Sequence, residues 1–183
     1  MGGVKSLLVG LGRATVEADP VGYEVCIDEE TWRSVDEARR RECQLAIQEL
    51  LDVGVEGWPQ RARRLCVSVT EQGCVMSWRD ADGRDVHPAL VVPRDVLAPH
   101  VQAYVDVIRA MERAEEGHGS ARLEALDMAK KLAHDDGARA LAQCITDSAL
   151  PLESCRKLFS LLFVLLVDTT RLHGHRGHRP VRG

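Results

Sequence analysis

The 183-residue chain has few aromatic side chains, which make up 4% of it although its hydrophobic content is 45%. A core with so few rings must be built mainly from Leu, Val and Ala. The longest apolar run, Leu161 to Val167, is far too short to cross a bilayer. The first residues also lack the apolar stretch and cleavage site of a secretory signal. We therefore expect a cytoplasmic protein without membrane contact.

The six cysteines include no Cys-x-x-Cys pair, the spacing that zinc and dithiol redox motifs commonly use. Cys43, Cys144 and Cys155 fall inside helical patterns, where a thiol packs as a small hydrophobic group. The sequence therefore predicts reduced thiols, no metal site and no cofactor.

Charge is unevenly distributed along the chain. Residues 171–183 carry four arginines and no acid, so the net charge of −4 leaves −8 for residues 1–170. A body this acidic argues against a nucleic-acid partner, and contact through the basic tail stays a third hypothesis. We predict a disordered basic tail over 171–183, a poorly ordered arm over 1–21 and a single α+β domain over 22–170.

Alternating apolar residues predict a strand at 23–27, and a Ser34–Glu37 capping box predicts a helix after it. Three further strands follow as a meander. A two-residue loop would place Val67 opposite Trp78, and a bulge at Gly83 would close the second hairpin. His87 is then expected on the sheet face away from Trp78.

Four helices are expected in the C-terminal half, at 94–116, 121–134, 138–146 and 152–169, with Gly137 ending the second. The last is apolar nearly all round and is therefore a central core helix or a subunit interface. The expected fold is α+β, in the order β-α-β-β-β-α-α-α-α, with a three- or four-stranded antiparallel sheet.

Residues 122–167 read RLEALDMAKKLAHDDGARALAQCITDSALPLESCRKLFSLLFVLLV. The segments that carry a family resemblance are this block, Ile27-Asp-Glu-Glu, Arg33-Ser34 and the Asp82-Gly83 turn. From about Tyr23 to Val167 the chain resembles a small bacterial family of uncharacterised proteins, of the UPF class, typical of alphaproteobacteria-like genomes. The resemblance implies a fold, but the activity of the family is unknown. It therefore assigns no catalytic role to any residue of this chain. Family members usually end just after the last helix, whereas a basic tail follows here.

One helix carries the candidate binding residues Asp127, Lys131 and His134, with Glu124 one turn earlier. Asp127 and His134 share a face but lie about 10 Å apart along the axis, too far for a direct acid–base pair. Lys131 is placed to pair with Asp127, and His134 to face the negative end of the helix. We assign none of them a catalytic role.

These patterns favour a non-catalytic cytosolic binding or regulatory module that acts through a protein partner, or as a homo-oligomer through the last helix. The reasons are the absence of a recognisable catalytic motif and the surplus of apolar surface on that helix. The alternative is a small enzyme or small-molecule binder that uses Asp127, Lys131 and His134, which requires those side chains to line a concave pocket.

Overall fold

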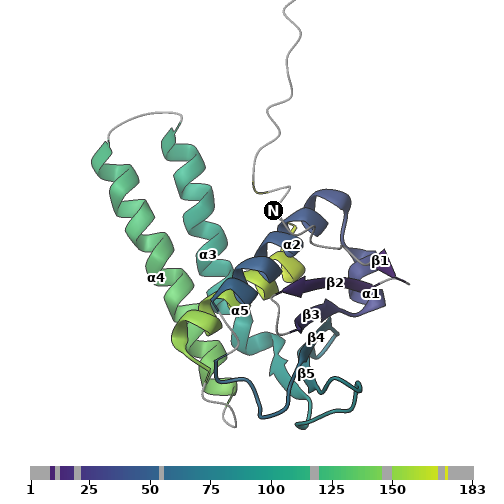
Figure 1. Ribbon diagram of the computed structural model, residues 1–183. Helices are drawn as coiled ribbons and strands as arrows, with labels where there is room; N and C mark the ends of the chain where they lie inside the picture. Colours follow the sequence, from purple (N-terminus) through teal and green to yellow (C-terminus); the bar gives the residue numbers. More distant parts are fainter. Residues whose placement is uncertain are drawn as a thin grey trace, which may run out of the picture.

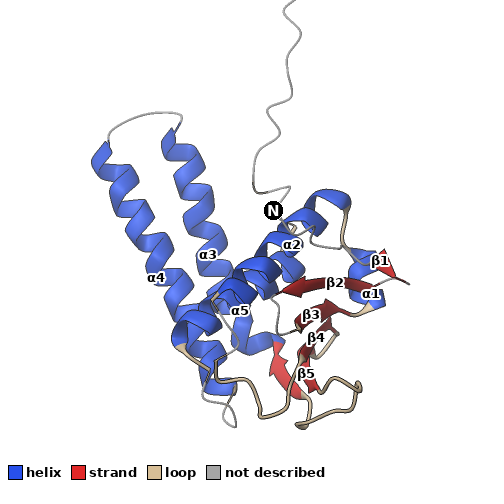
Figure 2. Ribbon diagram, viewed as in Figure 1, coloured by secondary structure: helices blue, strands red, loops and turns tan. Residues whose placement is uncertain are grey.

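A computed structural model describes residues 9–10, 13–18, 22–53, 56–115, 120–145, 150–168 and 172. Its strands are β1 (Val9–Gly10), β2 (Arg13–Ala18), β3 (Tyr23–Ile27), β4 (Arg64–Val69), β5 (Gly73–Arg79) and β6 (Leu90–Pro93). Its helices are α1 (Glu29–Ser34), α2 (Glu37–Asp52), α3 (Arg94–Glu115), α4 (Ser120–Cys144) and α5 (Leu152–Leu166). The fold is α+β with a helical C-terminal half, as expected (Figures 1 and 2).

The sheet has six strands in sequence order and is mixed, which corrects the expected antiparallel sheet of three or four strands. β3 and β4 run parallel, with Val25 beside Leu65 and Ile27 beside Val67. The physical reason is the connection between them. Because α1 and α2 carry the chain back to the end of the sheet where β3 began, β4 starts in the same direction.

β2 lies in the segment expected to be a poorly ordered arm. It pairs antiparallel with β3, from Ala14 beside Ile27 to Ala18 beside Tyr23, and β1 pairs with it in turn. Residues 9–10 and 13–18 thus form strands within the 1–21 segment that was expected to be an arm. Backbone hydrogen bonds to neighbouring strands stabilise β2, and a search for apolar periodicity does not detect them.

Two short-range caps define the helices after β3. Asp28 accepts hydrogen bonds from the backbone N–H groups of Glu30 and Thr31, at 3.0 and 3.1 Å, and thereby starts α1. Asp36 accepts from the N–H of Arg39 at 2.9 Å and starts α2. Ser34, the expected cap, instead ends α1. Both observed caps are carboxylates at helix N-termini, where the helix dipole favours them.

The β4–β5 hairpin is shifted by two positions from its expected register. Val67 lies beside Met76 rather than Trp78, because Gly73 is in the strand and not in the loop. Gly73 has a φ of 147°, and a Cβ there would lie 2.1 Å from the carbonyl oxygen of Val92 on β6. A shift of two keeps each side chain on its face, so Val67 and Trp78 both stay in the core.

The second hairpin turns at Gly83, as expected, with a φ of 82°. The N–H of Val86 donates to the Trp78 carbonyl at 2.9 Å. His87, however, does not lie on the face away from Trp78. Its ring packs edge-on to the indole with centroids 6.2 Å apart, because the chain leaves the ladder after Val86 and turns this side chain back. The expected position of His87 is therefore wrong.

α4 is one continuous helix where two were expected. Gly137 lies in its middle, buried against α5, and a Cβ there would be 2.4 Å from Cζ of Phe159. The glycine therefore allows two helices to approach closely and does not end a helix. The three helices α3, α4 and α5 replace the four expected.

α5 is a central core helix. Its buried side chains are Ser154, Cys155, Leu158, Phe159, Leu161, Leu162, Phe163 and Leu165. α2 packs beside α5, and the Arg39 guanidinium donates to the carbonyls of Val164 and Leu165, each at 2.9 Å. Figure 1 shows α3 and α4 extending from this centre as an antiparallel pair.

Among the described residues no helix is both long enough and apolar enough to cross a bilayer. The expected tail at 171–183 falls outside them except for Leu172, which is buried with Val105 and Phe163.

Candidate functional site

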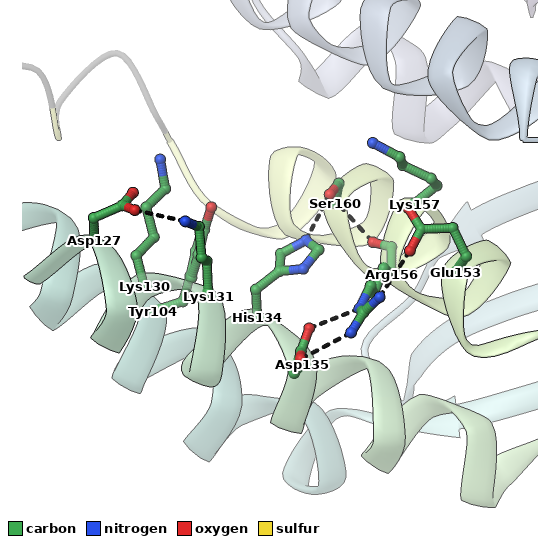
Figure 3. A pocket seen from close by; sticks show the side chains of 10 residues that line it. All are labelled: Tyr104, Asp127, Lys130, Lys131, His134, Asp135, Glu153, Arg156, Lys157 and Ser160. Carbon is green, nitrogen blue, oxygen red and sulfur yellow. Dashed lines mark hydrogen bonds and ion pairs between the residues drawn. The ribbon is translucent and has the colours of Figure 1, made fainter. Parts of the chain in front are cut away.

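A cleft of about 620 Å³ opens between α4 and α5, with α3 contributing one side chain (Figure 3). It is lined by Tyr104, Asp127, Lys130, Lys131, His134, Asp135, Glu153, Arg156, Lys157 and Ser160. Nine of these ten come from two helices, because each helix presents polar residues at one-turn spacing. The α4 set lies at i, i+3, i+4, i+7 and i+8, and the α5 set at i, i+3, i+4 and i+7.

His134 lies at the centre of the cleft. Its Nε2 is 2.8 Å from Oγ of Ser160, and its ring packs against Tyr104 and Phe159, with centroid distances of 5.6 and 5.5 Å. Burial lowers the pKa of His134 below 6.5, and the cations Lys157 and Arg156 add to this, while Asp135 and Glu153 oppose it. The imidazole is therefore mainly neutral at pH 7.

The Ser160 hydroxyl has one proton and two acceptors within reach. Its Oγ also lies 3.2 Å from the carbonyl oxygen of Arg156, one turn earlier in α5. If the hydroxyl donates to that carbonyl, His134 donates from Nε2 to Oγ; if it donates to His134, the other tautomer holds. Serine nucleophiles of the elbow type stand on sharp strand-to-helix turns, whereas Ser160 lies within a helix. The arrangement suits hydrogen bonding to a ligand better than acyl transfer.

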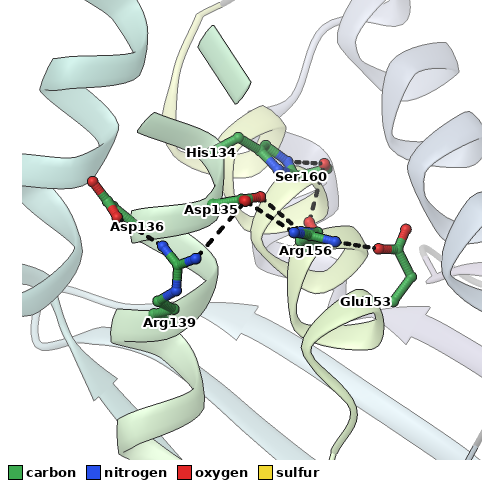
Figure 4. Close-up of polar contacts among 7 residues, drawn as sticks. All are labelled: His134, Asp135, Asp136, Arg139, Glu153, Arg156 and Ser160. Atoms are coloured by element: carbon green, nitrogen blue, oxygen red, sulfur yellow. Dashed lines mark hydrogen bonds and ion pairs between the residues drawn. The ribbon is translucent and has the colours of Figure 1, made fainter. Parts of the chain in front are cut away.

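A charge network ties the two helices together beside His134 (Figure 4). Arg156 binds Asp135 through two parallel hydrogen bonds, of 2.7 and 2.9 Å, and also donates to Glu153 at 2.8 Å. Asp135 in turn lies 4.0 Å from Arg139. The Arg156 hydrogen bonds lower the pKa of Asp135, and the two carboxylates raise that of Arg156. This two-pronged pair fixes one wall of the cleft.

Lysine is concentrated in this cleft. The chain uses arginine for 20 of its 24 cationic residues, yet three of its four lysines, Lys130, Lys131 and Lys157, line it. Lys131 pairs with Asp127 at 2.7 Å and Lys157 with Glu49 of α2 at 3.1 Å. Among the described residues Lys130 makes no ion pair, and its charge helps to lower the pKa of Asp127, after the larger effect of Lys131.

The lining therefore carries four cations and three carboxylates, a local positive excess in a chain of net charge −4. A lysine ammonium group is a compact point charge. Several such groups can therefore bind one anion from different sides. Within the described part of the chain no three His, Cys, Asp or Glu side chains are grouped as metal ligands.

Three of the four candidate residues from the sequence line this cleft, namely Asp127, Lys131 and His134. The predicted Asp127–Lys131 ion pair is present, with both side chains more than half exposed. Glu124 is exposed and lies outside the lining. His134 does not face a helix end, because α4 continues to Cys144, and its partner is a serine on another helix.

Sequence reasoning missed Lys130, Asp135, Arg156, Lys157 and Ser160. The repeated one-turn spacing in both segments was a usable signal. It required α4 to continue past Gly137, so that residues on either side of that glycine belong to one face, and it required α4 and α5 to be neighbours.

The sequence profile of the uncharacterised protein family UPF0262 matches residues 22–168. The chain belongs to this family. The match covers the elements from β3 to α5, including every residue that lines the cleft, and confirms the resemblance found in the sequence. No curated protein and no solved structure matches the chain. UPF0262 has no assigned function, so a role for the cleft must be argued from its chemistry.

Proposed function

We propose that this UPF0262 protein binds a small organic anion, carrying phosphate or carboxylate groups, in the cleft between α4 and α5. The observation that carries the proposal is that three of four lysines converge there beside a neutral histidine and a serine hydroxyl. The ammonium groups would neutralise the anion, while His134 and Ser160 would supply one donor and one acceptor to orient it. The proposed setting is the cytosol.

Pre-organisation of the cleft and its volume support this role. The bidentate Asp135–Arg156 pair and the His134–Ser160 hydrogen bond hold the two helix faces in place before any ligand arrives, which reduces the entropy cost of binding. The volume of about 620 Å³ is within the range of ligand pockets in other proteins. These features favour the small-molecule alternative over a site made only of surface ion pairs.

The test is a thermal-shift titration with inorganic phosphate, pyrophosphate and citrate at constant ionic strength. A ligand that binds only the folded state raises the melting temperature in a saturable way. We expect at least one of these anions to do so. Lys130→Ala should weaken its binding about 10- to 100-fold, the range for a lost charge-assisted hydrogen bond of about 1.5–3 kcal/mol.

Arg33→Ala is the matched control, because it removes the same charge from an exposed side chain of α1 that pairs only locally with Glu29. It should bind as the wild type does. If no anion shifts the melting temperature, or if both variants lose equal affinity, the proposal is wrong. A difference between the phosphate and citrate arms identifies which anionic group is preferred.

A second candidate is the protein-partner role expected from the sequence. The apolar side chains of α5 are buried within the chain, so the supporting observation lies on α4, where Met128 and Leu132 are 57% and 55% exposed one turn apart. Such a stripe suits helix pairing with a second copy. Light scattering over a concentration series should show dimers that the double variant Met128→Glu, Leu132→Glu lacks; a wild type that stays monomeric throughout rejects this candidate.

A further inference from the structure

Two cysteines lie side by side on the sheet face that points away from the core. Cys26 of β3 and Cys66 of β4 are partners in the parallel ladder. Their sequence neighbours Val25, Ile27 and Leu65 face the core, so alternation places both thiols on the opposite face. The two Sγ atoms are 2.6 Å apart.

This geometry suits a covalent bond between the two sulfurs. Adjacent strands are about 4.7–4.9 Å apart, within the roughly 4.4–6.8 Å between Cα atoms that disulfides span. Both side chains already point to the same face, so closure requires side-chain rotation without movement of the strands. The parallel pairing of β3 and β4 creates the juxtaposition, since the two residues are 40 positions apart in sequence.

Two arginine side chains lie near Cys26 and Cys66, and each forms an ion pair with a carboxylate. Arg64 donates to Glu24 at 2.5 Å, and Arg79 to Asp85 at 2.9 Å. The sulfurs of Cys66 and Cys26 lie near enough to raise the pKa of Arg79, after the larger effect of its hydrogen bond with Asp85. Nearby guanidinium groups favour the thiolate, which is the reactive form of cysteine.

Solvent access differs between the two thiols of the pair. Cys66 is half-buried, whereas Cys26 is 4% exposed. Burial raises the pKa of Cys43 and of Cys74 to about 11, which makes both poor nucleophiles at neutral pH. Cys66 is therefore placed to react first with a small oxidant, and Cys26 to react second.

We propose that Cys26 and Cys66 form a peroxide-reactive dithiol that closes reversibly to a disulfide joining β3 to β4. The Cys66 thiolate attacks one oxygen of hydrogen peroxide, the O–O bond breaks, and hydroxide leaves as a sulfenic acid forms. The Cys26 thiolate then attacks the Cys66 sulfur; the S–S bond forms and the sulfenic oxygen leaves as hydroxide. Overall two thiols and one peroxide give one disulfide and two waters, and two electrons pass from sulfur to peroxide.

The experiment treats the reduced full-length protein with hydrogen peroxide, denatures it, alkylates the remaining thiols and determines the intact mass. We expect the number of alkylated thiols to fall from six to four and to return to six after dithiothreitol. Digestion with trypsin and a glutamate-specific protease locates the bond, because cleavage after Glu71 separates Cys66 from Cys74. Six remaining thiols, or a bond between any other pair, would overturn the proposal.

Two variants sharpen the result. Cys26→Ser should leave Cys66 as a sulfenic acid that dimedone captures. Cys144→Ser is the control, because Cys144 of α4 is also half-buried. This variant should still lose two thiols when the Cys26–Cys66 bond forms. If Cys26→Ser still loses two thiols while Cys66 captures no dimedone, a different pair reacts and the assignment is wrong.

Discussion

At the scale of single residues, His134 combines the features that distinguish the cleft from an ordinary polar surface. It is partly buried between two aromatic rings, hydrogen-bonded to a serine and close to both charge signs. Burial is the largest influence on its pKa, which lies below the usual 6.5. Because burial disfavours the charged imidazole, protonation of His134 should lower the free energy of unfolding.

The pH dependence of stability should reveal this residue. Because the pKa of His134 is lowered in the folded state, the unfolded chain binds a proton that the folded chain does not, and stability is lost as pH falls below about 6.5. His134→Gln should lose less stability than wild type between pH 7 and 5, by up to about 1.4 kcal/mol for each pKa unit. Urea unfolding at a series of pH values measures the difference.

The comparison isolates one group, because the other six histidines are common to both proteins. The carboxylates with lowered pKa, Asp80, Asp127 and Asp135, protonate below 3.8 in the folded state and so contribute at more acidic pH. Identical pH profiles for wild type and variant would contradict the burial of a neutral imidazole.

At the scale of elements, the site depends on the contact between α4 and α5 at Gly137. A helix was expected to end at this glycine. Instead, α4 and α5 pack closely there, and the Phe159 ring occupies the space that a side chain would need. On either side of the contact, α4 contributes His134 and Asp135 to the cleft and Leu141 to the core. One small residue therefore sets how near the two polar faces lie.

Gly137→Ala should destabilise the protein by up to about 2 kcal/mol in urea unfolding. Alanine gains about 1 kcal/mol of helix propensity, but its Cβ would lie 2.4 to 2.7 Å from three Phe159 ring atoms, and overpacking costs about 1–3 kcal/mol. In a Phe159→Leu background the steric cost should vanish and the same substitution should become neutral or stabilising. An equal loss in both backgrounds would show that packing against this ring is not the cause.

At the scale of the whole molecule, burial is concentrated where the sheet, α2 and α5 meet. Among residues 121–144 of α4, the buried ones all lie from Gly137 to Leu141, whereas the N-terminal half of the helix extends away from the sheet beside α3. α3 packs along that half. Local opening requires less free energy where fewer apolar groups are buried.

Hydrogen exchange followed by mass spectrometry should therefore divide α4 in two. Backbone amides of residues 124–133 should exchange well before those of 137–144, and α5 should be the most protected helix. Both segments belong to the same helix, so a difference in exchange rate between them reports on packing rather than on the presence of helical structure. Uniform protection along α4 would mean that this helix opens only with global unfolding.

Local sequence patterns predicted the α+β class, the helical C-terminal half, the turn at Gly83 and three of the cleft residues. Those features follow from local periodicity, turn chemistry and i, i+4 spacing, which neighbours along the chain set. The family resemblance was also readable in the sequence. It carried a fold without an activity.

Long-range packing is responsible for the parallel pairing of β3 with β4, the continuity of α4 through Gly137 and the hydrogen bond between His134 and Ser160. The sequence around Gly137 does not show whether this glycine ends a helix or makes room for the ring of Phe159. The direction of a strand depends on where its connection returns, which no local pattern encodes. The cleft and the Cys26–Cys66 pair depend on contacts between distant segments, whose geometry is fixed when the core packs.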